Sequence, residues 1–175
     1  PEPGEDVLTI DPGLAFGSGF HDTTCLCVQY LEDTVQPGDI VFDIGTGTGI
    51  LAIAAAKLGA AHAAAVDFDS AAVAQARVNA AINGVEDRLS IANSDLLAAI
   101  PKGQKADVIV ANLVTNAVLA LLPTVAPYLK DGGTLIVSGI IDDRIDEVRA
   151  AAEKAGFVWA DEQLRSGWDA VKLTR

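Results

Sequence analysis

Residues 41–49 read Val-Phe-Asp-Ile-Gly-Thr-Gly-Thr-Gly, an apolar strand that leads into three glycines at alternate positions. A strand that turns sharply into a helix needs glycine where φ is positive or where a ligand presses on the backbone. After Gly49, apolar residues continue at helical spacing to Ala56, so the free N–H groups of a helix start face this turn. The stretch predicts a strand, a tight turn and a helix, and it indicates a site for a nucleotide-like ligand. A tight turn without a ligand is the alternative.

The spacing of the glycines separates two kinds of ligand. Dinucleotide-binding turns follow G-x-G-x-x-G or G-x-G-x-x-A, in which the last small residue permits close packing of helix on strand. Here Ile50 takes that place, and its bulk disfavours a nicotinamide dinucleotide. Residues 43–49 instead follow D-x-G-x-G-x-G, which resembles the first motif of class I S-adenosylmethionine-dependent methyltransferases. The resemblance implies that this cofactor is bordered by Gly45, Gly47 and Gly49.

Length and charge limit the possible partners. The chain of 175 residues fits one domain, and we expect residues 1–175 to form it. The formal net charge of −12 at pH 7 disfavours direct binding of nucleic acid, because phosphate binding is driven mainly by Lys and Arg. A basic protein partner is favoured instead. Methionine is absent even at position 1, so we expect further residues upstream in the full gene product.

The apolar runs and the two cysteines indicate where the protein resides and whether it binds a metal. No uncharged apolar run reaches about 18 residues, and no secretion signal opens the chain, so we expect a soluble protein without a membrane span. Cys25 and Cys27 are two apart in an expected helix, where a disulfide does not fit, which favours the reducing cytoplasm. Together with His21 they offer three metal ligands, but no fourth is evident, so no metal site is predicted.

Apolar runs alternate with helical patterns along the chain. Such alternation requires a parallel sheet that is covered by helices on both faces, and the Ser166-Gly167 turn predicts a terminal antiparallel hairpin. We therefore predict an α/β fold with a doubly wound, mostly parallel seven-stranded sheet. Expected strands are residues 40–44, 63–67, 88–92, 107–111, 134–141, 157–164 and 168–174. Expected helices are residues 49–58, 70–83, 142–155 and a stretch within 116–129.

Caps and helix breakers are expected at particular residues. Ser70 and Asp142 are predicted to cap the helices that they begin. The helix within residues 116–129 is expected to be interrupted by Pro123 and Pro127, and Asp131-Gly132-Gly133 is expected to close it.

Ligands of doubly wound sheets bind beyond the carboxyl ends of the strands, so the residues just after each strand are the candidates. Asp67 follows the second strand and can accept hydrogen bonds from two ribose hydroxyls; we count its neighbour Phe68 with it as a cofactor contact. Asp69 is the competing residue but better begins or caps the next helix. Asp95 follows the third strand and either accepts from an adenine amino group or caps the stretch 96–100.

Asn112 follows the fourth strand and is the predicted catalytic residue. Its side-chain oxygen can orient an amine, and its NH₂ group can donate to the cofactor. Methyl transfer needs the nitrogen lone pair in line with the methyl group, and positioning supplies most of the rate gain. Many amino-group methyltransferases have two prolines and an aromatic residue here, whereas this chain reads Leu113-Val114-Thr115. The sequence therefore predicts no aromatic clamp at this motif.

The segment before the first strand makes the resemblance specific. Residues 11–24 read Asp-Pro-Gly-Leu-Ala-Phe-Gly-Ser-Gly-Phe-His-Asp-Thr-Thr. They resemble L-D-P-G-L-A-F-G-T-G-T-H-P-T-T of the PrmA family, the lysine methyltransferases of large-subunit ribosomal protein eleven, with departures at Ser18, Phe20 and Asp22. The similarity extends over nearly the whole chain. It implies that residues 1–30 cover the cofactor, that Phe16 or His21 lines the site, and that S-adenosylmethionine contacts Thr24, Gly45, Asp67 and Asn112.

The resemblance implies a cytoplasmic class I methyltransferase that uses S-adenosylmethionine to methylate amines of a protein, such as lysine side chains or an α-amino group of a ribosomal protein. Family members have an N-terminal domain that grips the ribosomal protein, and 175 residues leave no room for it. Three alternatives stay open. The substrate is a small molecule or a nucleic acid, the chain is a non-catalytic cofactor-binding remnant, or it binds a nicotinamide dinucleotide. For His21, a loop histidine bonded to backbone is favoured over a general base.

Overall fold

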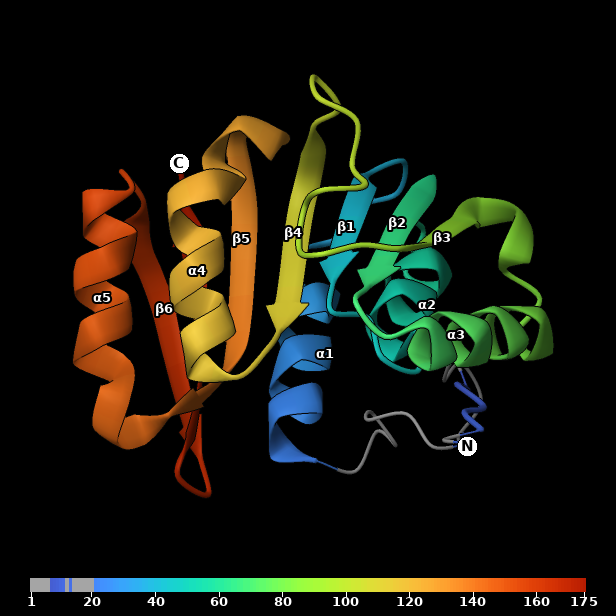
Figure 1. Cartoon of the computed structure of the whole chain (residues 1–175), viewed down its shortest axis with the longest axis horizontal. Coiled ribbons are helices and arrows are strands. Elements are labelled where there is room, and N and C mark those ends of the chain that lie inside the picture. Colours follow the sequence, from blue (N-terminus) through green and yellow to red (C-terminus); the bar gives the residue numbers. More distant parts are fainter. Residues whose placement is uncertain (1–6, 12, 14–20) are drawn as a thin grey trace.

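The computed structural model describes residues 7–11, 13 and 21–175. Its seven strands are β1 (Ile40–Ile44), β2 (His62–Asp67), β3 (Leu89–Asn93), β4 (Ala106–Asn112), β5 (Leu129–Ile141), β6 (Val158–Arg165) and β7 (Trp168–Thr174). They form one sheet in the order β3-β2-β1-β4-β5-β7-β6 (Figure 1). Strands β1 to β5 are parallel, and β7 is antiparallel to both β5 and β6. The predicted doubly wound α/β sheet with a terminal hairpin is confirmed.

Among the described residues, five helices cover the two faces of the sheet. They are α1 (Asp22–Thr34), α2 (Ile50–Lys57), α3 (Ser70–Ile82), α4 (Thr115–Val125) and α5 (Ile145–Lys154), with short 3₁₀ turns η1 (Glu86–Arg88), η2 (Ala126–Tyr128) and η3 (Asp142–Arg144). Side chains of α4 and α5 pack into one core cluster, and those of α1 and α2 into another. Side chains of α2 and α3 form a third, smaller cluster. In the part of the chain that is described, no helix is long and apolar enough to cross a membrane.

Strand β1 shows why the strands read as continuous apolar runs. Successive side chains of a strand point to opposite faces of the sheet. Phe42 and Ile44 lie in the core cluster beneath α4 and α5, whereas Val41 lies in the cluster beneath α1 and α2. Because helices cover both faces, neither set of positions meets water, and no polar alternation develops.

The interruption of the fourth helix that was predicted at Pro123 is wrong, whereas the helix does end before Pro127. Helix α4 continues through Pro123 and ends at Val125, before the 3₁₀ turn that contains Pro127. Pro123 removes one backbone hydrogen bond and crowds the carbonyl of residue 119. The burial of Leu121, Leu122 and Val125 in the core holds this part of the helix in place despite that cost. The expected stop at residues 131–133 is also wrong, because these residues belong to β5.

An irregular pairing explains the early start of β5. Ala106 pairs with Leu129, but Val108 pairs with Thr134, so the intervening residues of β5 are accommodated by a register shift. Lys130 donates to the carboxylate of Asp107 at 2.8 Å and 2.9 Å, which holds the shifted segment on β4.

The predicted caps by Ser70 and Asp142 are wrong, whereas the prediction that Asp69 begins or caps the helix is confirmed. Asp69, not Ser70, is the N-cap of α3, and its side chain accepts from the N–H of Ala71 at 2.8 Å. Asp142 lies inside the 3₁₀ turn η3, and α5 begins only at Ile145. The cap of α3 thus lies one residue before Ser70, whereas Arg144, the N-cap residue of α5, makes no side-chain capping hydrogen bond.

The order of the strands reverses between β1 and β4, since the chain proceeds outward from β1 to β3 and then returns to β4 on the other side. Helices that follow β1 and β4 therefore lie on opposite faces, and a crevice opens beyond the carboxyl ends of these two strands. This is the edge at which the predicted site residues were expected.

Asp169 in β7 is an uncompensated buried acid. It is fully buried, and neither carboxylate oxygen has a hydrogen-bond partner among the described residues. Burial, with smaller contributions from the carboxylates of Asp142 and Glu162, raises the pKa of Asp169 to about 6. The folded protein therefore keeps this proton at pH values where the unfolded chain has released it. The resulting contribution to stability is complete below the unfolded pKa of 3.8 and is lost as pH rises through about 6.

We expect Asp169→Asn to flatten the pH dependence of the free energy of unfolding. The amide has the shape of the acid without its charge, so the variant should be more stable than the parent by about 1–2 kcal/mol at pH 8 and should differ little at pH 4. Urea unfolding at both pH values measures this, with Asp131→Asn at an exposed position as the control. Equal losses of stability in parent and variant between pH 4 and pH 8 would contradict the expectation.

Candidate functional site

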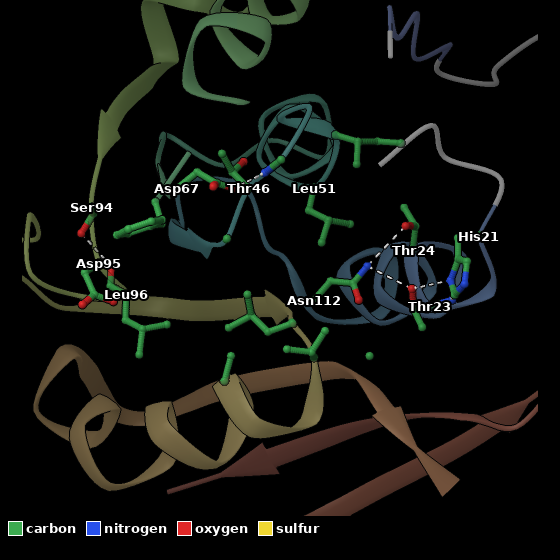
Figure 2. Close-up of a pocket in the computed structure, with 18 of the residues that line it drawn as sticks. His21, Thr23, Thr24, Thr46, Leu51, Asp67, Ser94, Asp95, Leu96 and Asn112 are labelled. Carbon is green, nitrogen blue, oxygen red and sulfur yellow. Dashed lines mark hydrogen bonds between the residues drawn. The ribbon is translucent and has the colours of Figure 1, made fainter. Parts of the chain in front are cut away.

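A cavity of about 590 Å³ opens at the carboxyl ends of β1, β2 and β4 (Figure 2). Its volume falls in the range of cofactor and small-molecule pockets. It is lined by His21, Thr23, Thr24, Gly45, Thr46, Gly47, Ile50, Leu51, Asp67, Phe68, Ser94, Asp95, Leu96, Asn112, Leu113, Val114, Ala117, Gly139 and Trp168. Of the described residues that line it, none is Lys or Arg.

The glycine-rich turn forms one wall of the cavity. Gly45, Gly47 and Gly49 all have positive φ, at 76°, 55° and 85°, which is the backbone region that glycine adopts at no steric cost. Gly45 and Gly47 line the cavity. A Cβ atom at Gly45 would lie 2.3 Å from the Leu113 side chain, so the turn approaches the end of β4 closely.

Gly49, predicted as a cofactor contact, does not line the cavity. It is the N-cap of α2, and a Cβ atom on it would lie 3.1 Å from the Cβ of Ala76 in α3. The third glycine of the motif is therefore explained by the close packing of α3 behind the turn.

Asp43 links the two ends of the glycine-rich turn by hydrogen bonds on the side away from the cavity. Its side chain is fully buried, and one carboxylate oxygen accepts from the Thr46 hydroxyl at 2.5 Å and from the N–H of Ala52 at 3.1 Å. Burial raises the pKa of Asp43 to about 7 against the lowering effect of these two donors, and the nearby Asp67 adds to the rise. This carboxyl joins the end of β1 to the first turn of α2 and leaves the upper surface of the turn to the cavity.

Asp67 lies at the end of β2, beside the turn. One carboxylate oxygen accepts from the N–H of Gly47 at 2.8 Å and the other from the N–H of Asp69 at 2.9 Å. Two backbone donors therefore fix its orientation, and each oxygen retains a lone pair for a further donor. Phe68, the next residue, lies at the rim with 77% of its surface exposed. The structure brings both predicted residues to the cavity, and Asp69 to the cap of α3.

Asp95 also lines the cavity, and it does not act as a helix cap. The side chain of Ser94 takes that place: its hydroxyl accepts from the N–H of Ala99 at 2.9 Å and donates to the carbonyl of Leu96 at 2.8 Å. The stretch 96–99 is a turn, and Leu96 has a positive φ of 47°. The carboxylate of Asp95 is thus left on the cavity side.

Asn112 stands at the end of β4, opposite the glycine-rich turn. Its side-chain NH₂ donates to the hydroxyls of Thr23 at 3.2 Å and Thr24 at 3.3 Å, as Figure 2 shows. We expected this NH₂ to donate to the cofactor, and the expectation needs correction because both of its hydrogens are directed at α1. The side-chain oxygen has no donor among the described residues, so it is the polar atom of Asn112 that a ligand can use.

Gly139 in β5 is required for this arrangement. It has a φ of 82°, and a Cβ atom there would lie 2.2 Å from the backbone oxygen of Leu113. The pairing of β5 with β7 shifts register at the same residue. A side chain at this position would displace the segment that carries Asn112.

His21 and Trp168 form an aromatic wall. His21 is the N-cap of α1, where its Nδ1 atom accepts from the N–H of Thr23 at 3.3 Å and lies 2.8 Å from the Thr23 hydroxyl. Its ring meets that of Trp168 edge to face, with 5.4 Å between centroids. The sequence predicted no aromatic clamp in the motif that follows Asn112, and it did not point to Trp168, which lies in the terminal hairpin. A search of the described residues finds no group of three potential metal ligands.

Most of the predicted site residues line one cavity. Thr24, Gly45, Gly47, Asp67, Phe68, Asp95 and Asn112 all line the cavity, and Gly49 lies behind it. Phe16 lies outside the described residues. Sequence reasoning did not find Thr23, Ser94, Leu96, Gly139 or Trp168, of which only Thr23 had a signal, its place beside Thr24.

Comparisons with known proteins give a consistent family. A curated ribosomal protein L11 methyltransferase from Caldanaerobacter subterraneus subsp. tengcongensis is 52% identical over 154 residues, which are 88% of this chain and 49% of the relative. The protein of the same name from Desulforamulus reducens is 49% identical over 157 residues, 90% of this chain and 50% of the relative. This chain therefore spans about half the length of the curated relatives that it matches.

Solved structures show the same fold as this chain, and one of them is from a protein with nearly the same name as the curated relatives. A ribosomal protein L11 methylase from Lactobacillus delbrueckii subsp. bulgaricus matches with a TM-score of 0.90 at 35% identity, over 97% of this chain and 86% of that one. A 16S rRNA N2 G1207 methyltransferase from T. thermophilus matches with a TM-score of 0.77 at 19% identity, over 92% of this chain and 45% of that one, which shows the fold alone. The family model described as "Ribosomal protein L11 methyltransferase (PrmA)" matches residues 1–175. The chain therefore belongs to the ribosomal protein L11 methyltransferase (PrmA) family.

Proposed function

We propose that residues 1–175 are the catalytic domain of an S-adenosylmethionine-dependent N-methyltransferase that acts on amino groups of a ribosomal protein. The observation that carries the proposal is the meeting of the glycine-rich turn, Asp67 and the free oxygen of Asn112 in one cavity. Family membership supports the same activity, since relatives about twice as long bear the name ribosomal protein L11 methyltransferase. A ribosomal substrate also favours the cytoplasm as the place of action.

The cavity fits S-adenosylmethionine, which supplies, when bound, an electrophilic methyl group on a positively charged sulfur. Asp67 would accept from the ribose hydroxyls and Asp95 from the adenine amino group, with Phe68 and Leu96 beside the base. Thr24 and the backbone of Gly45 would border the amino-acid part of the cofactor. Carboxylates near a cation are favourable, because opposite charges attract more strongly where water is excluded.

A nicotinamide dinucleotide fits less well. Its pyrophosphate needs free backbone N–H groups and often a cation. Here the N–H of Gly47 already donates to Asp67, and no Lys or Arg occurs among the described residues that line the cavity. The bulky Ile50, also in the lining, adds to this argument.

Asn112 would aim the amine. Its NH₂ is held by Thr23 and Thr24, so the amide plane is fixed and the oxygen can accept one hydrogen of an incoming amine. The apolar Leu113 and Val114 next to it favour the neutral form of a lysine amine over the charged form. Loss of the proton to water before alignment suffices, and His21 remains the N-cap of α1 rather than a general base.

The surface near the cavity suits a protein substrate. Val114 and Ile141 expose 71% and 46% of their surface, respectively, and Val114 lines the cavity mouth. The net charge of −12 attracts a basic protein and opposes RNA. Both features favour a ribosomal protein over a nucleic acid or a small metabolite.

We expect Asp67→Ala to weaken binding of S-adenosylhomocysteine by roughly 10- to 100-fold, because charge-assisted hydrogen bonds of about 1.5–3 kcal/mol are lost. Isothermal titration calorimetry measures the change. Asp69→Ala is the matched control: it removes the cap of α3 and lowers stability, but it should leave the affinity within about threefold. An unchanged affinity in Asp67→Ala would refute the cofactor assignment.

We expect Asn112→Ala to lower kcat by about 100-fold and to change the affinity for S-adenosylhomocysteine much less, because the amide oxygen aims the amine rather than holding the cofactor. Single-turnover kinetics with a ribosomal protein substrate separate the two quantities. Thr23→Ser keeps the hydroxyl that Asn112 bonds and serves as the control with near-parent kcat. A parent-like kcat in Asn112→Ala would exclude the amide from the reaction.

The substrate class is tested by incubating the chain and labelled S-adenosylmethionine with purified ribosomal protein L11, a basic-protein fraction, RNA and a metabolite pool. We expect label on amino groups of the ribosomal protein, located by mass spectrometry. Label confined to RNA or metabolites would overturn the substrate proposal. Cofactor binding without turnover in any arm would instead identify a non-catalytic remnant.

A further inference from the structure

Two amide side chains of α3 and that of its C-cap residue bind the backbone of residues 9–11. Gln75, Asn79 and Asn83 are four residues apart, so they lie on one face of the helix. Asn83 accepts from the N–H of Thr9 at 3.0 Å and donates to its carbonyl at 2.8 Å. Asn79 does the same for Asp11, at 2.9 Å and 3.0 Å, and Gln75 also donates to the Asp11 carbonyl, at 2.8 Å. The amides pair with alternate residues, as the edge of a neighbouring strand would.

Asn79 differs from the other two in its complete burial and in its contact with the glycine-rich turn. It is fully buried, and its second amide hydrogen is donated to the carbonyl of Thr48 at 2.9 Å. Thr48 lies between Gly47 and Gly49 in the glycine-rich turn. Both amide hydrogens and the amide oxygen of Asn79 are thus used by the backbone of two segments far apart in the sequence.

The turn is therefore held from two sides. On the cavity side, Asp67 accepts from the N–H of Gly47 at 2.8 Å. On the opposite side, Asn79 donates to the carbonyl of the next residue, Thr48, and Ala76 on the same helix lies against Gly49. Asn79 does not line the cavity, so any effect that it has on a ligand acts through the backbone of the turn.

We infer that Asn79 is a positioning residue, whose buried amide sets the glycine-rich turn for S-adenosylmethionine and couples it to the docking of residues 9–11 on α3. This inference rests on the proposed cofactor. The coupling follows from the shared amide: one side-chain rotamer must satisfy Thr48 and Asp11 together, so displacement of either segment removes partners from the other. By linkage, a ligand that orders the turn also favours the docked segment.

The test compares Asn79→Ala with Asn83→Ala in the 175-residue chain, with S-adenosylhomocysteine as the probe. Asn79→Ala should weaken its binding at least tenfold by calorimetry. Asn83→Ala releases Thr9 without touching the turn, so it should speed hydrogen exchange of the Thr9 amide and leave the affinity within twofold. Equal affinities in the parent and Asn79→Ala would overturn the inference, whereas a parent that does not bind the probe would overturn the proposed function instead.

Asn79→Ala could lose affinity simply because it folds poorly. A second variant and a measurement on the parent therefore test the coupling independently. Asn79→Asp keeps an acceptor for the Asp11 N–H but turns an oxygen toward the carbonyls of Asp11 and Thr48. Its affinity relative to the parent should recover as pH falls, because the protonated acid donates again. In the parent, saturating probe should slow exchange of the Asp11 amide. A pH-independent defect in Asn79→Asp, or Asp11 exchange that ignores the probe, would contradict the coupling.

Discussion

One sharp reversal of the chain, from the end of β1 at Ile44 to the start of α2 at Ile50, sets the conditions for the rest of the molecule. The backbone N–H groups of Gly45 and Thr46 both donate to the carbonyl of Val66, at 2.8 Å and 2.9 Å, so the turn is anchored on β2. Asp43 closes it from below through Thr46 and Ala52. Neighbouring side chains leave no room for a Cβ atom at Gly45 and little at Gly49, so the backbone of the turn itself forms part of the cavity wall.

The polar groups of the site meet because parallel strands end at one edge of the sheet. Asp67 ends β2 and Asn112 ends β4, and β1 lies between these strands. Each group is then oriented by a neighbour from a different element: Asp67 by the N–H of Gly47, and Asn112 by hydroxyls of α1. This support fixes the side chains before any ligand arrives, which lowers the entropic cost of binding and aligning reactants.

Much of the fold was predictable because its signals are local. Apolar runs and glycine stops placed the strands to within a residue or two, except β5. Asp67 and Asn112, the last residues of β2 and β4, were predicted from topology, motif spacing and the family resemblance. Pro123 was misjudged, because a helix that is held by tertiary packing tolerates a proline that its local pattern disfavours. Trp168 and Gly139 could not be found, because they reach the cavity through the pairing of β5 with β7, which no local pattern encodes.

The sequence by itself determined the doubly wound sheet, the glycine-rich turn and the identity of the acidic and amide residues at the strand ends, since these depend on periodicity and backbone sterics. Only the tertiary structure decided which atoms of those residues are free. The NH₂ of Asn112 donates to α1, and Gly49 packs against α3. Asn79 donates to the carbonyls of both Thr48 and Asp11. Hydrogen-bond partners far apart in the chain are assigned by packing, because each buried donor and acceptor must be satisfied by whatever group the fold brings near it.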